Sequence, residues 1–72
     1  MNFPNKKVVD AIKERYPIGT RVKLVRMNDK YAPPIGMLGT VEGVDDIGSI
    51  MVAWDTGSHL SVVYGEDRCE KI

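Results

Sequence analysis

Cysteine and long apolar runs are scarce in this chain, and each scarcity excludes a class of structure. Cys69 is the only cysteine, so one chain can form neither an internal disulfide nor a cysteine-based metal site. No apolar run approaches the roughly 20 residues that a membrane-spanning helix needs. The first residues, MNFPNKK, also lack the apolar segment of a signal peptide. We therefore expect a cytoplasmic protein that does not contact a membrane.

A length of 72 residues leaves room for one small domain, which we expect to span residues 1–72. Hydrophobic content of 43% and charged content of 28% are ordinary for a globular protein, so we expect the chain to fold. The net charge is zero, yet eight basic and three acidic residues precede Met37, and two basic and seven acidic residues follow from there on. This distribution predicts either a bipolar surface that orients a partner, or interleaved strands that mix the charges in space.

Residues 5–15 carry the spacing of an amphipathic helix. The apolar side chains of one helical face are Val8, Ala11, Ile12 and Tyr16. Asn2 or Asn5 can cap the start of the helix, and Pro17 disfavours helical geometry in the residue before it. Because so short a helix is marginal by itself, its apolar face must dock, either on the rest of the domain or on a partner.

From Gly19 onward the pattern changes to the alternation of β-strands. The first strand covers residues 20–24, and the loss of alternation at 25–27 predicts a β-bulge. Pro33 and Pro34 lack backbone donors, so residues 28–36 form an extended loop. Four further strands are predicted at 39–44, 50–54, 60–62 and 69–72, joined by turns.

This order of elements predicts a mainly β fold. Five short strands with one long loop after the first indicate a five-stranded SH3-like barrel over residues 19–72, preceded by a short N-terminal α-helix. An OB-like barrel is the alternative, and it fits less well because its helix commonly lies within the meander of strands.

The letters Asp55-Thr56-Gly57-Ser58 are those of an aspartic protease loop. Such an enzyme needs two of these loops, whose carboxyl groups share one proton, and a flap. Too few residues follow Asp55 to supply them, whereas an Asp at the start of a glycine-containing turn is common hairpin chemistry. We therefore predict a turn here.

The remaining reactive side chains form no catalytic or metal-binding pattern. His59 is expected on the surface of a strand, Cys69 inside the barrel, and the adjacent Asp45 and Asp46 in a solvated turn. We therefore expect a protein that is not an enzyme, with no catalytic residue, no metal and no cofactor.

Binding to a protein partner is the first functional hypothesis. Barrels of this kind present loop aromatics to extended peptides, and the candidate binding residues here are Tyr31, Pro33, Pro34 and Tyr64. Trp54 shares the inward face of its strand with Ile50 and Val52, so it is expected in the core. The open edges of so small a barrel also predict weak self-association into a homo-oligomer.

Binding to nucleic acid is the alternative hypothesis. The first strand and the following loop supply a basic face made of Arg21, Lys23, Arg26 and Lys30. The net charge of zero argues against it, because nucleic-acid-binding domains are usually basic. The alternative depends on these side chains remaining free of the acids in the second half of the chain.

Two stretches of the sequence carry a resemblance to a known family, namely YPIGTRVKLVRM and APPIGMLGTVEGVDDIGSIMVAWDTGSHLSVV. From Tyr16 to Ile72 the chain resembles a bacterial and phage domain of unknown function with a diproline loop and a Trp-Asp-x-Gly-Ser hairpin. The resemblance implies an SH3-like small barrel in a phage or mobile-element accessory protein, and it implies no activity or site residues. GTVEGVD and SIMVAWDTGS are more distantly similar to barrel modules of eukaryotic ubiquitin ligases, which implies protein binding.

Overall fold

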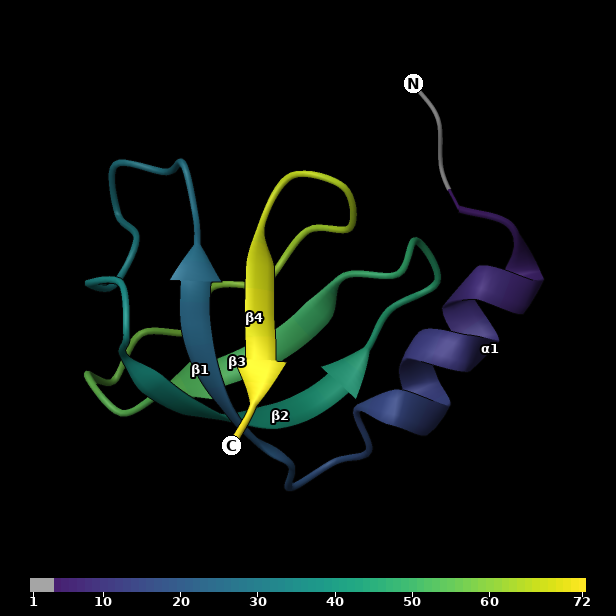
Figure 1. Ribbon diagram of the computed structural model, residues 1–72, viewed down its shortest axis with the longest axis horizontal. Helices are drawn as coiled ribbons and strands as arrows, with labels where there is room; N and C mark the ends of the chain where they lie inside the picture. The colour runs from purple at the N-terminus through teal and green to yellow at the C-terminus, as the bar shows by residue number, and fades with distance from the viewer. Residues whose placement is uncertain (1–3) are drawn as a thin grey trace.

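One short helix precedes a four-stranded antiparallel sheet in the computed structural model, which describes residues 4–72 (Figure 1). Helix α1 spans Lys6–Arg15, and the strands are β1 (Arg21–Arg26), β2 (Leu38–Val44), β3 (Ile50–Trp54) and β4 (Arg68–Lys71). The order in the sheet is β3-β2-β1-β4, so the sheet does not close between β3 and β4. The mainly β class with one short N-terminal helix is confirmed.

Helix α1 begins and ends at the predicted signals. The Asn5 side chain accepts a hydrogen bond from the Val8 N–H at 3.0 Å, which satisfies a donor that the first turn leaves without a partner. Asn2, the other candidate cap, lies outside the described residues. At the other end the Tyr16 N–H donates to the Ile12 carbonyl at 2.9 Å. No helix in the described part of the chain is long and apolar enough to cross a membrane.

Strand β1 lies in the middle of the sheet and contains the predicted bulge. It pairs with β2 on one side and with β4 on the other, and the register with β4 shifts between Leu24 and Arg26. Pairing resumes after the shift, so the strand runs to Arg26 rather than ending at Leu24 as predicted.

The prediction of five strands is not confirmed, because residues 60–62 form no strand. Val62 alone pairs with β3, exchanging hydrogen bonds of 2.9 and 2.8 Å with Ile50. The Leu60 carbonyl instead accepts a hydrogen bond from Nε1 of Trp54 at 2.9 Å. The backbone group that would continue a ladder is therefore used to satisfy a buried indole.

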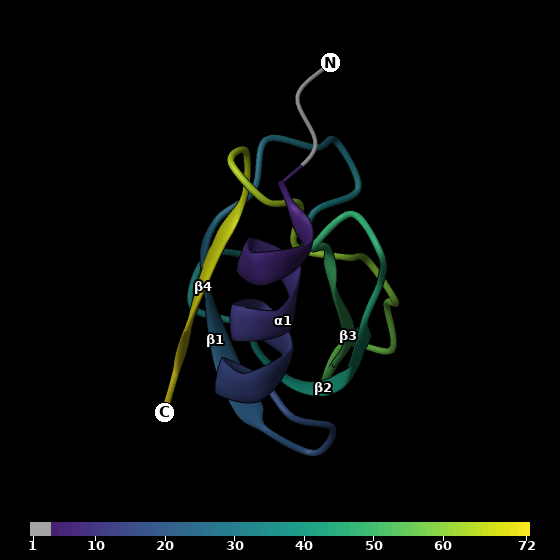
Figure 2. The same ribbon diagram turned by 90° about the vertical axis from the view of Figure 1, so that its right-hand side faces the viewer.

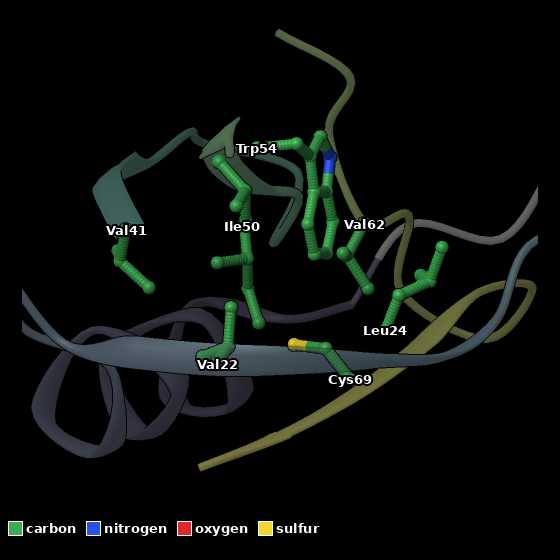
Figure 3. Close-up of a cluster of buried hydrophobic side chains, with 8 residues drawn as sticks. Val22, Leu24, Val41, Ile50, Trp54, Val62 and Cys69 are labelled. Carbon is green, nitrogen blue, oxygen red and sulfur yellow. The ribbon is translucent and has the colours of Figure 1, made fainter. Parts of the chain in front are cut away.

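The core lies between the two halves of the bent sheet. Its buried side chains are Val22, Leu24, Val41, Ile50, Val52, Trp54, Val62 and Cys69. Figure 3 shows Ile50 and Trp54 pointing from β3 towards Val22 on β1 and Cys69 on β4. Trp54 is 2% exposed, which confirms its predicted place in the core.

Helix α1 lies at the open side of this arrangement. Figure 2 shows α1 in front of the space between β1 and β4 on one side and β2 and β3 on the other. Val9 is buried, Ile12 packs against the core, and Pro4 and Ile12 approach Gly48 in the turn after β2. The apolar face of the helix is therefore docked on its own domain.

Candidate functional site in the groove between α1 and β4

Two residues of the predicted basic face are joined to acids. Arg21 makes a two-pronged ion pair with Asp55, with N–O distances of 2.8 and 2.7 Å, and also donates to Thr40 at 2.9 Å. This hydrogen-bonded pair lowers the pKa of Asp55 and raises that of Arg21. Lys23 reaches Glu70 on β4 at 3.0 Å. In both pairs, a cation from the first half of the chain contacts an acid from the second half, as expected if interleaved strands mix the charges in space.

The other two residues of that face are exposed and lie further along the chain. Arg26 stands opposite Arg68 in the register of β1 and β4. The Lys30 ammonium lies 5.0 Å from the centre of the Tyr31 ring. The four predicted basic residues therefore do not form one continuous free cationic surface.

The predicted protein-binding residues also lie in separate parts of the molecule and differ in their exposure to solvent. Tyr31 is 71% exposed and Pro34 is exposed, both in the loop between β1 and β2. Pro33 is buried, so its ring packs inside the molecule instead of lying open to a peptide. Tyr64 lies outside that loop, in the segment between β3 and β4.

Tyr64 forms part of a groove between α1 and β4, which has a volume of about 460 Å³. This volume is within the ~300–1,000 Å³ range of protein ligand sites. Its apolar lining consists of Ile12, Tyr16, Ile50, Val62, Tyr64 and Cys69. Figure 1 shows α1 on the side of β4 that faces away from β1, and residues of both elements line the groove.

Among residues 4–72, the backbone groups at the outer edge of β4, beside this groove, have no hydrogen-bond partner. Ile72 donates its N–H to the Arg21 carbonyl at 3.3 Å, and Lys71 stands opposite Val22. In an antiparallel ladder the hydrogen-bonded positions alternate, so Glu70 and Ile72 bond towards β1. The N–H and C=O groups of Cys69 and Lys71 therefore point away from β1, at the free edge of the sheet.

Two cationic side chains lie near the Tyr16 ring at the C-terminal end of β4. The Arg15 guanidinium and the Lys71 ammonium each lie 5.9 Å from the centre of the Tyr16 ring. Neither cation has a carboxylate within ion-pair distance among residues 4–72. Two cations therefore converge on one ring from separate elements, α1 and β4.

Two acids line the groove, and each of them bonds to another residue of the chain. Asp67 accepts a hydrogen bond from the Val63 N–H at 3.0 Å, and Glu70 is paired with Lys23. Arg68 also lines the groove without an acid within ion-pair distance among residues 4–72. The groove lining therefore carries three cations, Arg15, Arg68 and Lys71, against two acids, Asp67 and Glu70, and Glu70 is already paired with Lys23.

Three side chains of reactive types are buried or engaged with other residues: Cys69, which lines the groove, and His59 and Asp55, which do not. Burial raises the pKa of the Cys69 thiol to about 11, which keeps it protonated at neutral pH. His59 contacts Glu42 at 2.9 Å on the exposed surface. Asp55 begins a turn in which the Gly57 N–H donates to the Trp54 carbonyl at 2.8 Å. No cluster of three or more His, Cys, Asp or Glu that could hold a metal occurs in residues 4–72.

Sequence reasoning named Tyr64 as a candidate binding residue, but it did not name Arg15, Tyr16, Arg68 or Lys71, which also line the groove. α1 and β4 lie near opposite ends of the chain, and no motif in the sequence links them. The proximity of α1 and β4 depends on how α1 docks and on which strand pairs with β1. No local sequence pattern predicts either of these features.

A family model described as Domain of unknown function (DUF4314) matches residues 5–72. The chain belongs to the DUF4314 family. The match includes helix α1, whereas the resemblance noted above begins at Tyr16, so the helix and its groove are part of the DUF4314 domain. A search of the curated proteins finds no match to this chain.

Proposed function

We propose that this protein is a non-enzymatic interaction module that binds an extended segment of a protein partner in the groove between α1 and β4. The observation that carries this proposal is the free edge of β4, where Cys69 and Lys71 present backbone donors and acceptors to the groove. An extended peptide satisfies such groups by adding a strand to the sheet. Tyr64, half-exposed on the groove wall, supplies an aromatic contact.

A proline substitution distinguishes the contribution of the β4 backbone to peptide binding from the contribution of the Lys71 side chain. Lys71→Pro removes the N–H that faces the groove and keeps the bonds of Glu70 and Ile72 to β1, as an edge strand tolerates. Lys71→Ala is the matched control, because it removes the same side chain and keeps the N–H.

The experiment selects peptides from a displayed random library on the wild-type protein and measures their affinity for both variants. We expect Lys71→Pro to bind about fivefold more weakly than Lys71→Ala, since one hydrogen bond contributes ~1 kcal/mol. Thermal unfolding of both variants controls for folding. Equal affinity of the two variants for every selected peptide would place the binding site away from β4.

Binding to nucleic acid is a second candidate, favoured by one observation. Arg26, Lys30 and Tyr31 are exposed, and Lys30 stacks over the Tyr31 ring, an arrangement that could hold a phosphate and stack a base. The pairing of Arg21 and Lys23 with acids weakens this candidate. Fluorescence anisotropy with single- and double-stranded DNA and RNA at two salt concentrations tests it, because phosphate contacts weaken steeply with salt.

We also propose that the sheet is an open variant of an SH3-like barrel. The bridge of Val62 to Ile50, at the outer edge of β3, supports this proposal because a fifth strand would lie there. Such a module suits an accessory protein of a bacterium or phage, as the resemblance implies, and a cytoplasmic location stays a prediction from the sequence. An experimental structure tests the fold by the presence or absence of a ladder through residues 60–62.

A further inference from the structure

We infer that the segment bound in this groove is acidic, with a carboxylate side chain opposite Lys71 and an apolar side chain opposite Cys69. The inference rests on the proposed function and specifies the partner's chemistry. It follows from the unneutralised cations around Tyr16 and from the direction of side chains in a strand added to β4.

The first argument is charge complementarity. Arg15 and Lys71 flank the Tyr16 ring, and none of the ion pairs within residues 4–72 involves either of them. A cation without an acidic partner attracts an anion that approaches it. A carboxylate of the partner that lies opposite Lys71 can pair with its ammonium while the partner chain remains bonded to β4.

The second argument is the geometry of strand addition. Residues directly opposite each other in neighbouring strands place their side chains on the same face of the sheet. The peptide residue opposite Lys71 therefore points towards Lys71 and the Tyr16 ring. The residue opposite Cys69 points towards the apolar floor, where Ile50 and Val62 lie. The two peptide positions are separated by one residue, because side chains alternate along a strand.

The positive charge of the groove and the free edge of β4 together favour an extended peptide over other occupants of the groove. A phosphate backbone would also satisfy the cations, but it has no row of amide groups to pair with Cys69 and Lys71. A second copy of this chain would have to bring into the groove an acid other than Asp67 and Glu70, which already bond to Val63 and Lys23. An acidic extended peptide satisfies both the edge and the charge.

The test uses blocked synthetic peptides and amide chemical shifts, which detect millimolar binding and locate it. The probe is Thr-Thr-Glu-Thr-Val-Thr-Thr, and its control carries lysine in place of glutamate. We expect the probe to shift the amide signals of Cys69 and Lys71 and to bind about fivefold more tightly than the control, the upper range for a surface ion pair.

Charge reversal makes the test specific. Lys71→Glu should reverse the preference, so that the lysine peptide binds more tightly than the glutamate peptide. Lys13→Glu changes the net charge equally on α1, outside the groove lining, and should leave the preference unchanged. An unchanged preference in Lys71→Glu would overturn the inference.

Other outcomes separate this inference from the proposed function. Equal binding of both peptides at β4 would overturn the acidic preference and leave the proposed function standing. Peptide-induced shifts confined to other elements would overturn both. Concentration-dependent shifts of Cys69 and Lys71 without peptide, or stronger shifts with an oligonucleotide, would identify a different occupant and overturn the inference.

Discussion

Gly39 and Trp54 stand directly opposite each other on β2 and β3, and the indole occupies the space that a side chain at position 39 would need. A β-carbon at Gly39 would lie 2.6 Å from Val52 Cγ1 and 2.8 Å from Trp54 Cε3. Trp54 can therefore fill the core only because residue 39 has no side chain.

We predict that Gly39→Ala lowers the free energy of unfolding by about 1–3 kcal/mol, the usual effect of overpacking a core. Urea unfolding followed by Trp54 fluorescence measures it. Gly43→Ala is the matched control on the same strand, because its β-carbon would meet only the flexible end of Met51, 2.9 Å away. Equal destabilisation by both substitutions would show that steric conflict at Trp54 is not the cause.

The packing of α1 depends on Gly48. This residue has a φ of +82°, and a β-carbon there would lie 3.1 Å from Pro4 Cγ and 3.3 Å from Ile12 Cδ1. We predict that Gly48→Ala costs about 1–3 kcal/mol from backbone strain. It should also speed hydrogen exchange of the Tyr16 amide at the end of α1, because the helix must move outward.

Gly65→Ala provides the control for this effect. Gly65 has a similar φ of +83°, but a β-carbon there would meet no atom within 4 Å. It should therefore lose stability through backbone strain alone, with unchanged exchange at Tyr16. The same loss of Tyr16 protection in both variants would contradict a steric role for Gly48 in docking the helix.

The Arg21–Asp55 pair predicts a dependence of stability on pH. The hydrogen bonds from Arg21 lower the pKa of Asp55 from its ordinary value of 3.8, so the folded state favours the ionised carboxyl. Its stabilisation is therefore present above about pH 4 and is lost as the pH falls through the lowered folded-state pKa. We expect Asp55→Asn to be less stable than the wild type at neutral pH, and the difference to shrink on acidification.

Thermal unfolding from neutral to acidic pH measures this difference. Glu66→Gln removes an exposed carboxylate that has no ion-pair partner among residues 4–72, and it controls for the change in net charge. A stability difference for Asp55→Asn that persists undiminished at low pH would contradict the ion-pair explanation.

The buried thiol of Cys69 leads us to predict that the stability of the fold also depends on pH in the alkaline range. Burial raises the pKa of its thiol from 9.0 to about 11, so the folded state favours the protonated form. The associated stabilisation is complete below about pH 9 and is lost as the pH rises towards 11. We expect the stability of the wild type to fall over this interval more steeply than that of Cys69→Ala.

Alkylation by iodoacetamide supplies a second measurement on Cys69. At a pH below 9, two units of pKa correspond to about a hundredfold less thiolate in the folded protein than in the unfolded protein. Alkylation in native buffer should therefore be slower than in urea by a factor of this order. Equal rates would mean that the thiol is not desolvated in the folded state.

Local patterns in the sequence determined most of the secondary structure. Asn5 and Pro17 bound the helix, the alternation after Gly19 predicted β1 with its bulge, and the third predicted strand coincides with β3. These features depend on neighbouring residues, so a single sequence contains them. The burial of Trp54 followed from the same alternation.

Tertiary structure alone decided the rest. Residues 60–62 keep only the bridge at Val62, while the Leu60 carbonyl accepts a hydrogen bond from the Trp54 indole, and Pro33 is buried although it lies in a loop. The basic face was divided because β3 and β4 bring acids to Arg21 and Lys23. The groove exists because α1 docks beside the free edge of β4, a contact between distant segments that long-range packing determines and local sequence does not.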